Sequence, residues 1–314
     1  MKNLFILSAL IFVGCTQHRS KNTDNYQPQP TVYASPKGDK IVFLDDYYLA
    51  FLKGVRAGNK NTDSLYRAVI QNPIMSTYFA KSEYSDLIKM GFYYPIQDTT
   101  GLANYISSIK SSEGKIEQLI TKALSDANKI LKNDSITVYV EPSNIYMRSM
   151  IQKMEGITAV TAGSKQIVIT VDTNVSGWDE MLKYTIAHEF NHTYWTVKNF
   201  SKLDKFTLLN YLVFEGRADS YAHLIYPDFK CPWTAALMEN EKTDLWNKIK
   251  PDLQSEDEML ERGVMFGSNT YPIWGGYTLG YSIVQSALKN HPELKPEEWA
   301  SMDTQKILEM SDYK

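Results

Sequence analysis

The string His188-Glu189-Phe190-Asn191-His192 constrains this chain more than any other feature. Residues four apart lie on one face of an α-helix, so the string predicts a helix whose two imidazoles can bind one metal ion. Glu189 follows His188 by one residue, about 100° around the helix. It can therefore stand beside the metal ion without binding it. The chain contains only five histidines, which gives weight to two of them at this spacing.

The residues around this string predict a long helix from about residue 178 to residue 197. Apolar residues recur there every four positions: Trp178, Leu182, Ile186, Phe190 and Tyr194. A second helix is predicted from about residue 206 to residue 225, where apolar residues are also frequent. Both helices are long enough to cross the middle of a domain.

The second predicted helix contains the string Glu215-Gly216-Arg217-Ala218-Asp219. A catalytic zinc ion takes three protein ligands and keeps a fourth position for water, and Glu215 is the expected third ligand. An unpaired carboxylate among apolar neighbours is costly, which favours a ligand over a surface glutamate. Asp219, one turn further, is expected to accept the remaining ring N–H of a histidine. Arg217 is expected to pair with Asp219 or to contact substrate, with a structural role favoured.

The rest of the chain predicts an α+β fold that is mostly helical. Residues 135–141 and 166–172 are rich in β-branched and aromatic residues, and predict a small sheet of at least two strands. Residues 156–165, between them, contain two glycines and no long apolar stretch. We expect an N-terminal helical region over residues 41–134. A zincin-like domain with an active-site helix and a glutamate helix is expected over residues 135–314.

The N-terminus resembles the signal peptide of a bacterial lipoprotein. One lysine precedes an uncharged apolar run over residues 4–13, which is too short to span a bilayer. A glycine directly before Cys15 is typical of lipidation at that cysteine. We expect residues 1–14 to be a signal peptide and the polar residues 15–40 to be a tether. An ordinary secretory signal or a cytoplasmic start with a buried strand are the alternatives.

These features predict a protein of the bacterial cell envelope, anchored in the periplasm or the outer membrane by lipid on Cys15. The net charge of −3 gives no basic surface for nucleic acid, so no nucleic-acid partner is expected. Two cysteines, one of them expected to carry lipid, exclude a disulfide scaffold. The oligomeric state stays open.

An HExxH string followed by a helical ExxxD string resembles the gluzincin metallopeptidases. Glu215 follows His192 by 23 residues, a few more than in thermolysin-like enzymes. The strings AHEFNHTYW, YLVFEGRADSYAHLIYP, CPW and GGYTLGYSIV look more like a bacterial family of predicted zinc-dependent proteases, catalogued largely as a domain of unknown function. This resemblance covers about residues 135–290.

The resemblance implies a peptidase that acts on peptide or protein substrates with one Zn²⁺ ion. The ion would be bound by His188, His192 and Glu215, and Glu189 would act as general base on the zinc-bound water. The chemistry of these residue types supports the same roles.

Gluzincins usually supply a tyrosine or histidine that stabilises the oxyanion. Tyr277 and Tyr281, four residues apart in GYTLGY, are the candidates, although packed aromatics are the alternative for both. His223 is a further candidate, with a structural histidine favoured. By analogy, the strand at residues 166–172 is expected to bind extended substrate.

The main alternative is an envelope lipoprotein that binds zinc with little or no turnover and acts in binding or assembly. A solute-binding lipoprotein fits the tether but leaves the histidine pair and Glu215 unexplained.

Overall fold

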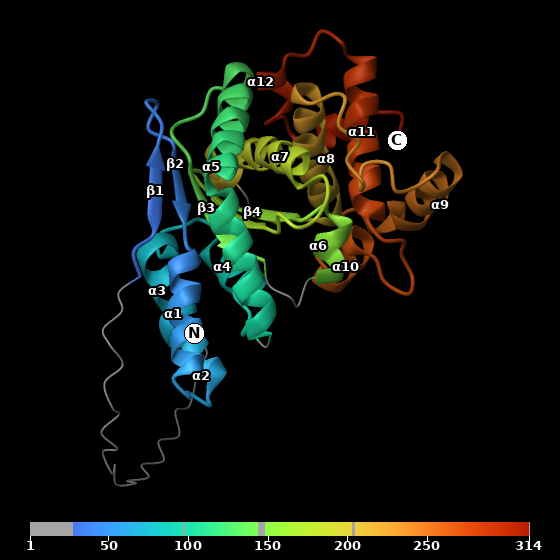
Figure 1. Cartoon of the computed structure of the whole chain (residues 1–314). Coiled ribbons are helices and arrows are strands. Elements are labelled where there is room, and N and C mark those ends of the chain that lie inside the picture. Colours follow the sequence, from blue (N-terminus) through green and yellow to red (C-terminus); the bar gives the residue numbers. More distant parts are fainter. Residues whose placement is uncertain (1–27, 97, 144–147, 203–204, 314) are drawn as a thin grey trace, which may run out of the picture.

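The computed structural model describes residues 28–96, 98–143, 148–202 and 205–313. These residues form a five-stranded sheet in the order β1-β2-β3-β5-β4, with helices on both faces (Figure 1). The strands are β1 (Thr31–Ala34), β2 (Lys40–Phe43), β3 (Thr137–Pro142), β4 (Ile157–Gly163) and β5 (Gln166–Val171). The three central strands are parallel, whereas β1 and β4 are antiparallel edges. The predicted mostly helical α+β class is confirmed.

Helical segments connect and follow the strands. They are α1 (Asp45–Arg56), α2 (Thr62–Tyr66), η1 (Arg67–Gln71), α3 (Asn72–Ile74), η2 (Met75–Phe79), α4 (Ser85–Gly91), α5 (Thr99–Ile130), α6 (Arg148–Lys153), α7 (Trp178–Asn199), η4 (Phe200–Lys202), α8 (Leu208–Ile225), α9 (Glu239–Ile249), η5 (Lys250–Asp252), α10 (Glu258–Phe266), α11 (Gly275–Asn290), α12 (Pro296–Trp299) and α13 (Thr304–Met310). Within the described ranges, none of them combines the length and the apolar character needed to cross a membrane.

The sheet separates two hydrophobic cores because successive side chains of a strand point to opposite faces. One core, with α7, α8 and most of α5, contains Ile41, Phe43, Val138, Val140, Ile167 and Ile169. The other core, with α1 to α4, contains Val42, Tyr139 and Val168. The two helices that carry His188, His192 and Glu215, α7 and α8, therefore lie on the face opposite the N-terminal helices.

The sheet is larger than the sequence predicts. Within residues 156–165, Ile157–Gly163 form strand β4, and the two glycines lie at its ends: Gly156 adopts a positive φ of 86°, and Gly163 leaves room for a neighbouring side chain. Residues 31–34, expected in the tether, form β1. The predicted signal peptide and Cys15 lie outside the described residues, and the proposed division at residue 134 stays a prediction.

The two long helices form where the sequence predicts them, within a few residues at each end. α7 is buried almost all round, and it packs against β4, α5 and α8. α8 begins after Thr207, whose hydroxyl accepts a hydrogen bond from the backbone N–H of Asn210, while the Asn210 side chain bonds back to Thr207. Core packing therefore fixes both helices that carry the candidate ligands, and a capping box also fixes the start of α8.

α8 and α11 cross with their backbones almost in contact. A Cβ atom at Gly280 would lie 2.0 Å from the carbonyl oxygen of Leu212, and one at Gly216 would lie 2.1 Å from that of Gly280. Only glycine allows this approach. The crossing fixes the rotation of α11, and with it the direction in which the tyrosines of that helix point.

Candidate metal centre

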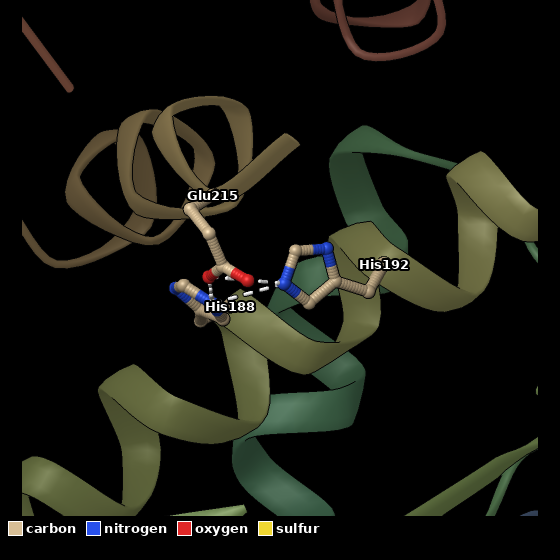
Figure 2. A group of neighbouring side chains, drawn as sticks. All are labelled: His188, His192 and Glu215. Carbon is tan, nitrogen blue, oxygen red and sulfur yellow. Dashed lines mark hydrogen bonds and ion pairs between the residues drawn. The ribbon is translucent and has the colours of Figure 1, made fainter. Parts of the chain in front are cut away.

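His188 and His192 lie one turn apart on α7, with both imidazoles turned toward one point (Figure 2). Their Nε2 atoms are 3.1 Å apart, and both side chains are buried. Helix geometry alone brings the two residues together, as their spacing requires.

Glu215 approaches the two histidines from α8 (Figure 2). Its Oε2 atom lies 3.2 Å from Nε2 of His188 and 3.5 Å from Nε2 of His192. Burial by itself raises the pKa of the Glu215 carboxyl, but the charges and hydrogen bonds of both imidazoles outweigh it and lower the pKa to about 2. The carboxylate is therefore held in the ionised form that a metal ion requires.

These three side chains fit a single metal ion. Bonds of about 2.1 Å to a tetrahedral zinc ion put two ligand atoms about 3.4 Å apart. The three ligand-atom separations here are 3.1, 3.2 and 3.5 Å. Among the residues that the structure describes, His188, His192 and Glu215 are the group of His, Cys, Asp and Glu side chains that converges in this way, and all three are buried. The site is thus consistent with one metal ion.

Asp219, one turn after Glu215, fixes the orientation of His188. Its Oδ1 atom lies 2.9 Å from Nδ1 of His188. A proton on Nδ1 makes this hydrogen bond and leaves the lone pair of Nε2 for a metal ion. The structure thus brings Asp219 to the histidine ring on the side away from Glu215.

Two further side chains hold the Asp219 carboxylate, and sequence reasoning missed both. Trp233 donates its indole N–H to the two carboxylate oxygens at 3.0 and 3.1 Å, and Tyr184 donates its hydroxyl to Oδ1 at 3.2 Å. Trp233 ends the CPW string that follows α8. The sequence could have indicated Trp233, because it follows Asp219 by 14 residues and a buried carboxylate requires hydrogen-bond donors such as an indole N–H.

His192 is oriented by packing. Its Nδ1 atom is buried and has no hydrogen-bond partner among the described residues. Phe214 stacks on the imidazole, with the ring centroids 3.9 Å apart and the planes 12° apart. Stacking on Phe214 therefore fixes the plane of the His192 ring, whereas a hydrogen bond to Asp219 fixes that of His188.

Glu189 is held by a strand residue that the sequence did not indicate. The hydroxyl of Thr161, on β4, lies 2.7 Å from Oε2 of Glu189. Both side chains are buried. The carboxylate therefore has a fixed direction beside the two histidines, and its Oε1 atom remains for other chemistry.

Tyr277 and Tyr281 lie one turn apart on α11 but meet different neighbours. Burial, followed by the charge of Glu215, raises the pKa of Tyr277 well above its usual value. Burial, followed by the charge of Asp219, raises the pKa of Tyr281 to about 12, and its ring lies 6.0 Å from that of His223. The Tyr277 ring packs against Trp233 and Phe266, with centroids 6.3 and 5.8 Å away, so the two tyrosines have different neighbours.

Tyr211 is a second tyrosine near the ligands, and sequence reasoning missed it. It lies one turn before Glu215 on α8 and is partly buried. Burial first, and then the charge of Glu215 with a smaller effect of Glu189, raises its pKa. Its spacing of four from a candidate ligand on a helix was the available signal.

Arg217 does not reach the metal centre. Its buried guanidinium donates to the backbone carbonyl of Met302 and to the hydroxyl of Thr304. Two residues after Glu215 on a helix, its side chain points to another face. Arg217 was expected to pair with Asp219 or to contact substrate. Instead it links α8 to the C-terminal segment at Met302 and Thr304.

The expectation that residues 166–172 bind extended substrate is wrong. These residues include β5, which lies between β3 and β4 and is paired on both sides. Unpaired backbone groups are available only at a sheet edge. On this side of the sheet the edge strand is β4, which also packs against α7.

A comparison with protein families matches residues 116–309 to the family described as predicted Zn-dependent protease (DUF2268). The match covers more than half of the chain and includes both histidines and Glu215. No curated protein and no solved structure matches the chain.

Proposed function

This chain belongs to the family of predicted zinc-dependent proteases, and from that membership we propose that it hydrolyses peptide bonds with one zinc ion held by His188, His192 and Glu215. The observation that carries the proposal is the convergence of these three buried side chains on one point. Two imidazoles and a carboxylate are a donor set of catalytic zinc sites, which supports zinc as the ion.

Hydrolysis needs a Lewis acid and a general base, and different groups of the site supply them. A zinc ion, when bound, supplies a Lewis acid that polarises the scissile carbonyl and makes a water molecule more acidic. Glu189 takes a proton from the attacking water and passes it to the leaving amine. Thr161 holds Oε2 of that carboxylate, which leaves Oε1 to carry the proton.

We assign stabilisation of the developing oxyanion to the hydroxyl of Tyr277. A positioned donor stabilises the charge that forms on the carbonyl oxygen. The raised pKa of Tyr277, caused by burial and then by Glu215, keeps its phenol protonated and able to donate. Tyr211, one turn before Glu215 on α8, offers a second hydroxyl, and Tyr281, one turn after Tyr277 on α11, is the alternative donor.

We also propose that the protein is a lipoprotein of the bacterial cell envelope, anchored by lipid on Cys15. The support is the sequence of the first 15 residues: a lysine, an apolar run and a glycine before the cysteine. A Cys15→Ser variant should take up no labelled fatty acid and should leave the membrane fraction. Unchanged labelling of that variant would refute the proposal.

The peptidase proposal is tested by purified protein that is stripped with a chelator and reloaded with zinc. We expect the zinc-loaded protein to cleave members of a diverse peptide library, and the stripped protein to cleave none. Glu189→Gln should retain zinc and lose hydrolysis. Glu180→Gln, an exposed glutamate in the first turn of the same helix, is the matched control and should remain active.

Two results would count against the proposal. Undiminished hydrolysis by Glu189→Gln would refute the role of that carboxylate. A zinc-loaded wild-type protein that cleaves no library peptide would instead favour a function in binding or assembly.

A further inference from the structure

Another part of this chain covers one end of β4, the edge strand next to the metal centre. At Thr161 the strand contacts Glu189. One residue later, the backbone N–H of Tyr84 donates to the carbonyl oxygen of Ala162 at 3.1 Å. The hydrogen-bonding edge of β4 is thus occupied by another part of this chain directly beyond the reaction centre.

Glu83 covers the next position of the strand. Its carboxylate accepts hydrogen bonds from the backbone N–H of Ser164 at 3.2 Å and from the Ser164 hydroxyl at 2.5 Å. A Cβ atom at Gly163 would lie 2.1 Å from Oε2 of Glu83 and 3.2 Å from its backbone nitrogen. The glycine is therefore what lets Glu83 lie over the strand, and the Glu83 side chain itself is exposed.

Tyr84, the residue after Glu83, connects this end of β4 to α7, the proposed active-site helix. Its hydroxyl lies 3.0 Å from that of Thr196, one turn after His192 on α7, and its ring packs edge-on against Phe200 at 5.3 Å. Residues 82–85, here called the closing segment, thus run from the sheet edge to α7. They cover the edge of β4 at Ala162 and Gly163 and contact α7 one turn beyond His192.

Little of the β4 edge remains between Thr161, which contacts Glu189, and Gly163, which Glu83 covers. The strand has a bulge between Thr161 and Gly163, so this stretch advances by at most two residues, roughly 7 Å. An extended peptide on this edge therefore has room for one or two residues between its scissile bond and Glu83. In the other direction β4 continues back to Ile157, past Ala159 and Val160, which are partly exposed.

The negative charge of Glu83 determines which end of a bound peptide can lie beside Gly163. A carboxylate attracts an ammonium group and repels a carboxylate. After its two bonds from Ser164, Glu83 still has acceptor positions for an amine. A peptide that lies antiparallel to β4 has its N-terminus near Gly163, so strand direction and charge agree.

We propose that this peptidase removes one or two residues from peptides with a free N-terminal amine, which is bound by Glu83. The C–N bond breaks as water adds across it, so the short fragment gains a carboxylate and the remaining peptide gains a new amine. This inference rests on the proposed peptidase function. The closing segment precedes the residues matched by the family, 116–309, so it adds a restriction that the family match does not contain.

The test compares matched peptides with a free or an acetylated N-terminus, and identifies the products by mass spectrometry. We expect kcat/KM of the wild type to be at least about tenfold higher for the free amine. Glu83→Gln keeps an acceptor for Ser164 and should bring this ratio close to one, mainly by raising KM for the free peptide. Asp86→Asn, three residues on and exposed, is the control and should keep the wild-type ratio.

A binding measurement makes the test independent of turnover. In zinc-loaded Glu189→Gln protein, the free peptide should bind more tightly than the acetylated one, and adding Glu83→Gln should remove the difference. Equal cleavage of both peptides, or internal cleavage of long acetylated peptides, would overturn this inference and leave the peptidase proposal intact. Failure of the wild type to cleave any peptide would overturn both.

Discussion

The hydroxyl of Thr161 lies 2.7 Å from the carboxylate of Glu189 and 3.0 Å from the backbone carbonyl of the same residue. Both residues are buried, one on the edge strand and the other on the active-site helix. The direction of the proposed general base is thus set by the sheet as well as by its own helix.

Replacing Thr161 with valine keeps the shape of the side chain and removes this bond. We expect kcat to fall by about 10- to 100-fold, because a misplaced base loses much of its effect. KM and zinc content should change little, since the Thr161 hydroxyl bonds to Glu189 and not to a ligand of the ion. Steady-state kinetics and metal analysis of the variant measure both quantities.

Two further variants separate this role from a general effect on β4. Thr161→Ser keeps the hydroxyl and should regain most of the lost rate. Thr158→Val, on the same strand, removes a hydroxyl that pairs with Thr170 at 2.6 Å instead of with the site. It should keep the wild-type kcat, and a wild-type rate in Thr161→Val would contradict the prediction.

Asp219 should determine how tightly zinc binds. Asp219→Asn removes the charge that orients His188, and loss of such a partner lowers metal affinity by about 10- to 100-fold. Competition with a chelating dye measures the affinity. Asp228→Asn, an exposed change just after α8, should have no effect; equal affinities for the two variants would show that Asp219 does not act in this way.

The metal ligands were predictable because their geometry is local. His188 and His192 need only a helix to converge, and apolar residues every four positions predicted that helix. Glu215 was predictable from the chemistry of zinc, which needs a third ligand from a second element. Nothing beyond helix periodicity and donor chemistry was required.

The residues that position the site depend on long-range packing that no local pattern records. Thr161 was missed because its segment contains two glycines, which lie at the ends of a strand instead of interrupting it. Tyr277 and Tyr281 lie one turn apart on α11, and only the crossing of α8 and α11 decides that Tyr277 packs against Trp233 and Tyr281 against His223. Tyr84 contacts α7 across more than 100 positions of sequence.

That crossing makes a prediction about stability. Gly280→Ala puts a methyl group 2.0 Å from the carbonyl oxygen of Leu212, and overpacking of this kind should lower the unfolding free energy by about 2–4 kcal/mol. Gly114→Ala, inside α5 with no atom within 4 Å of the new Cβ, should raise it by about 0.5–1 kcal/mol. Urea unfolding measures both, and a Gly280→Ala protein as stable as wild type would contradict the close approach.

The core on the other side of the sheet contains a titratable group of its own. Glu141, near the end of β3, accepts hydrogen bonds from the hydroxyls of Tyr48, at 2.6 Å, and Tyr93. Burial raises the pKa of the Glu141 carboxyl from the usual 4.5 to about 7, against the smaller lowering effect of these two bonds. The folded protein therefore holds this proton more tightly than the unfolded chain does.

Stability should consequently fall as pH rises through this range. The contribution of Glu141 is complete below about pH 4.5 and is lost as pH passes about 7, a change of about 3 kcal/mol. Glu141→Gln stays neutral at every pH, so its unfolding free energy relative to wild type should rise by about that amount between pH 4 and pH 8. Urea unfolding at both pH values, with chelator present to remove metal binding, measures the difference. Parallel pH dependence of the two proteins would contradict the raised pKa.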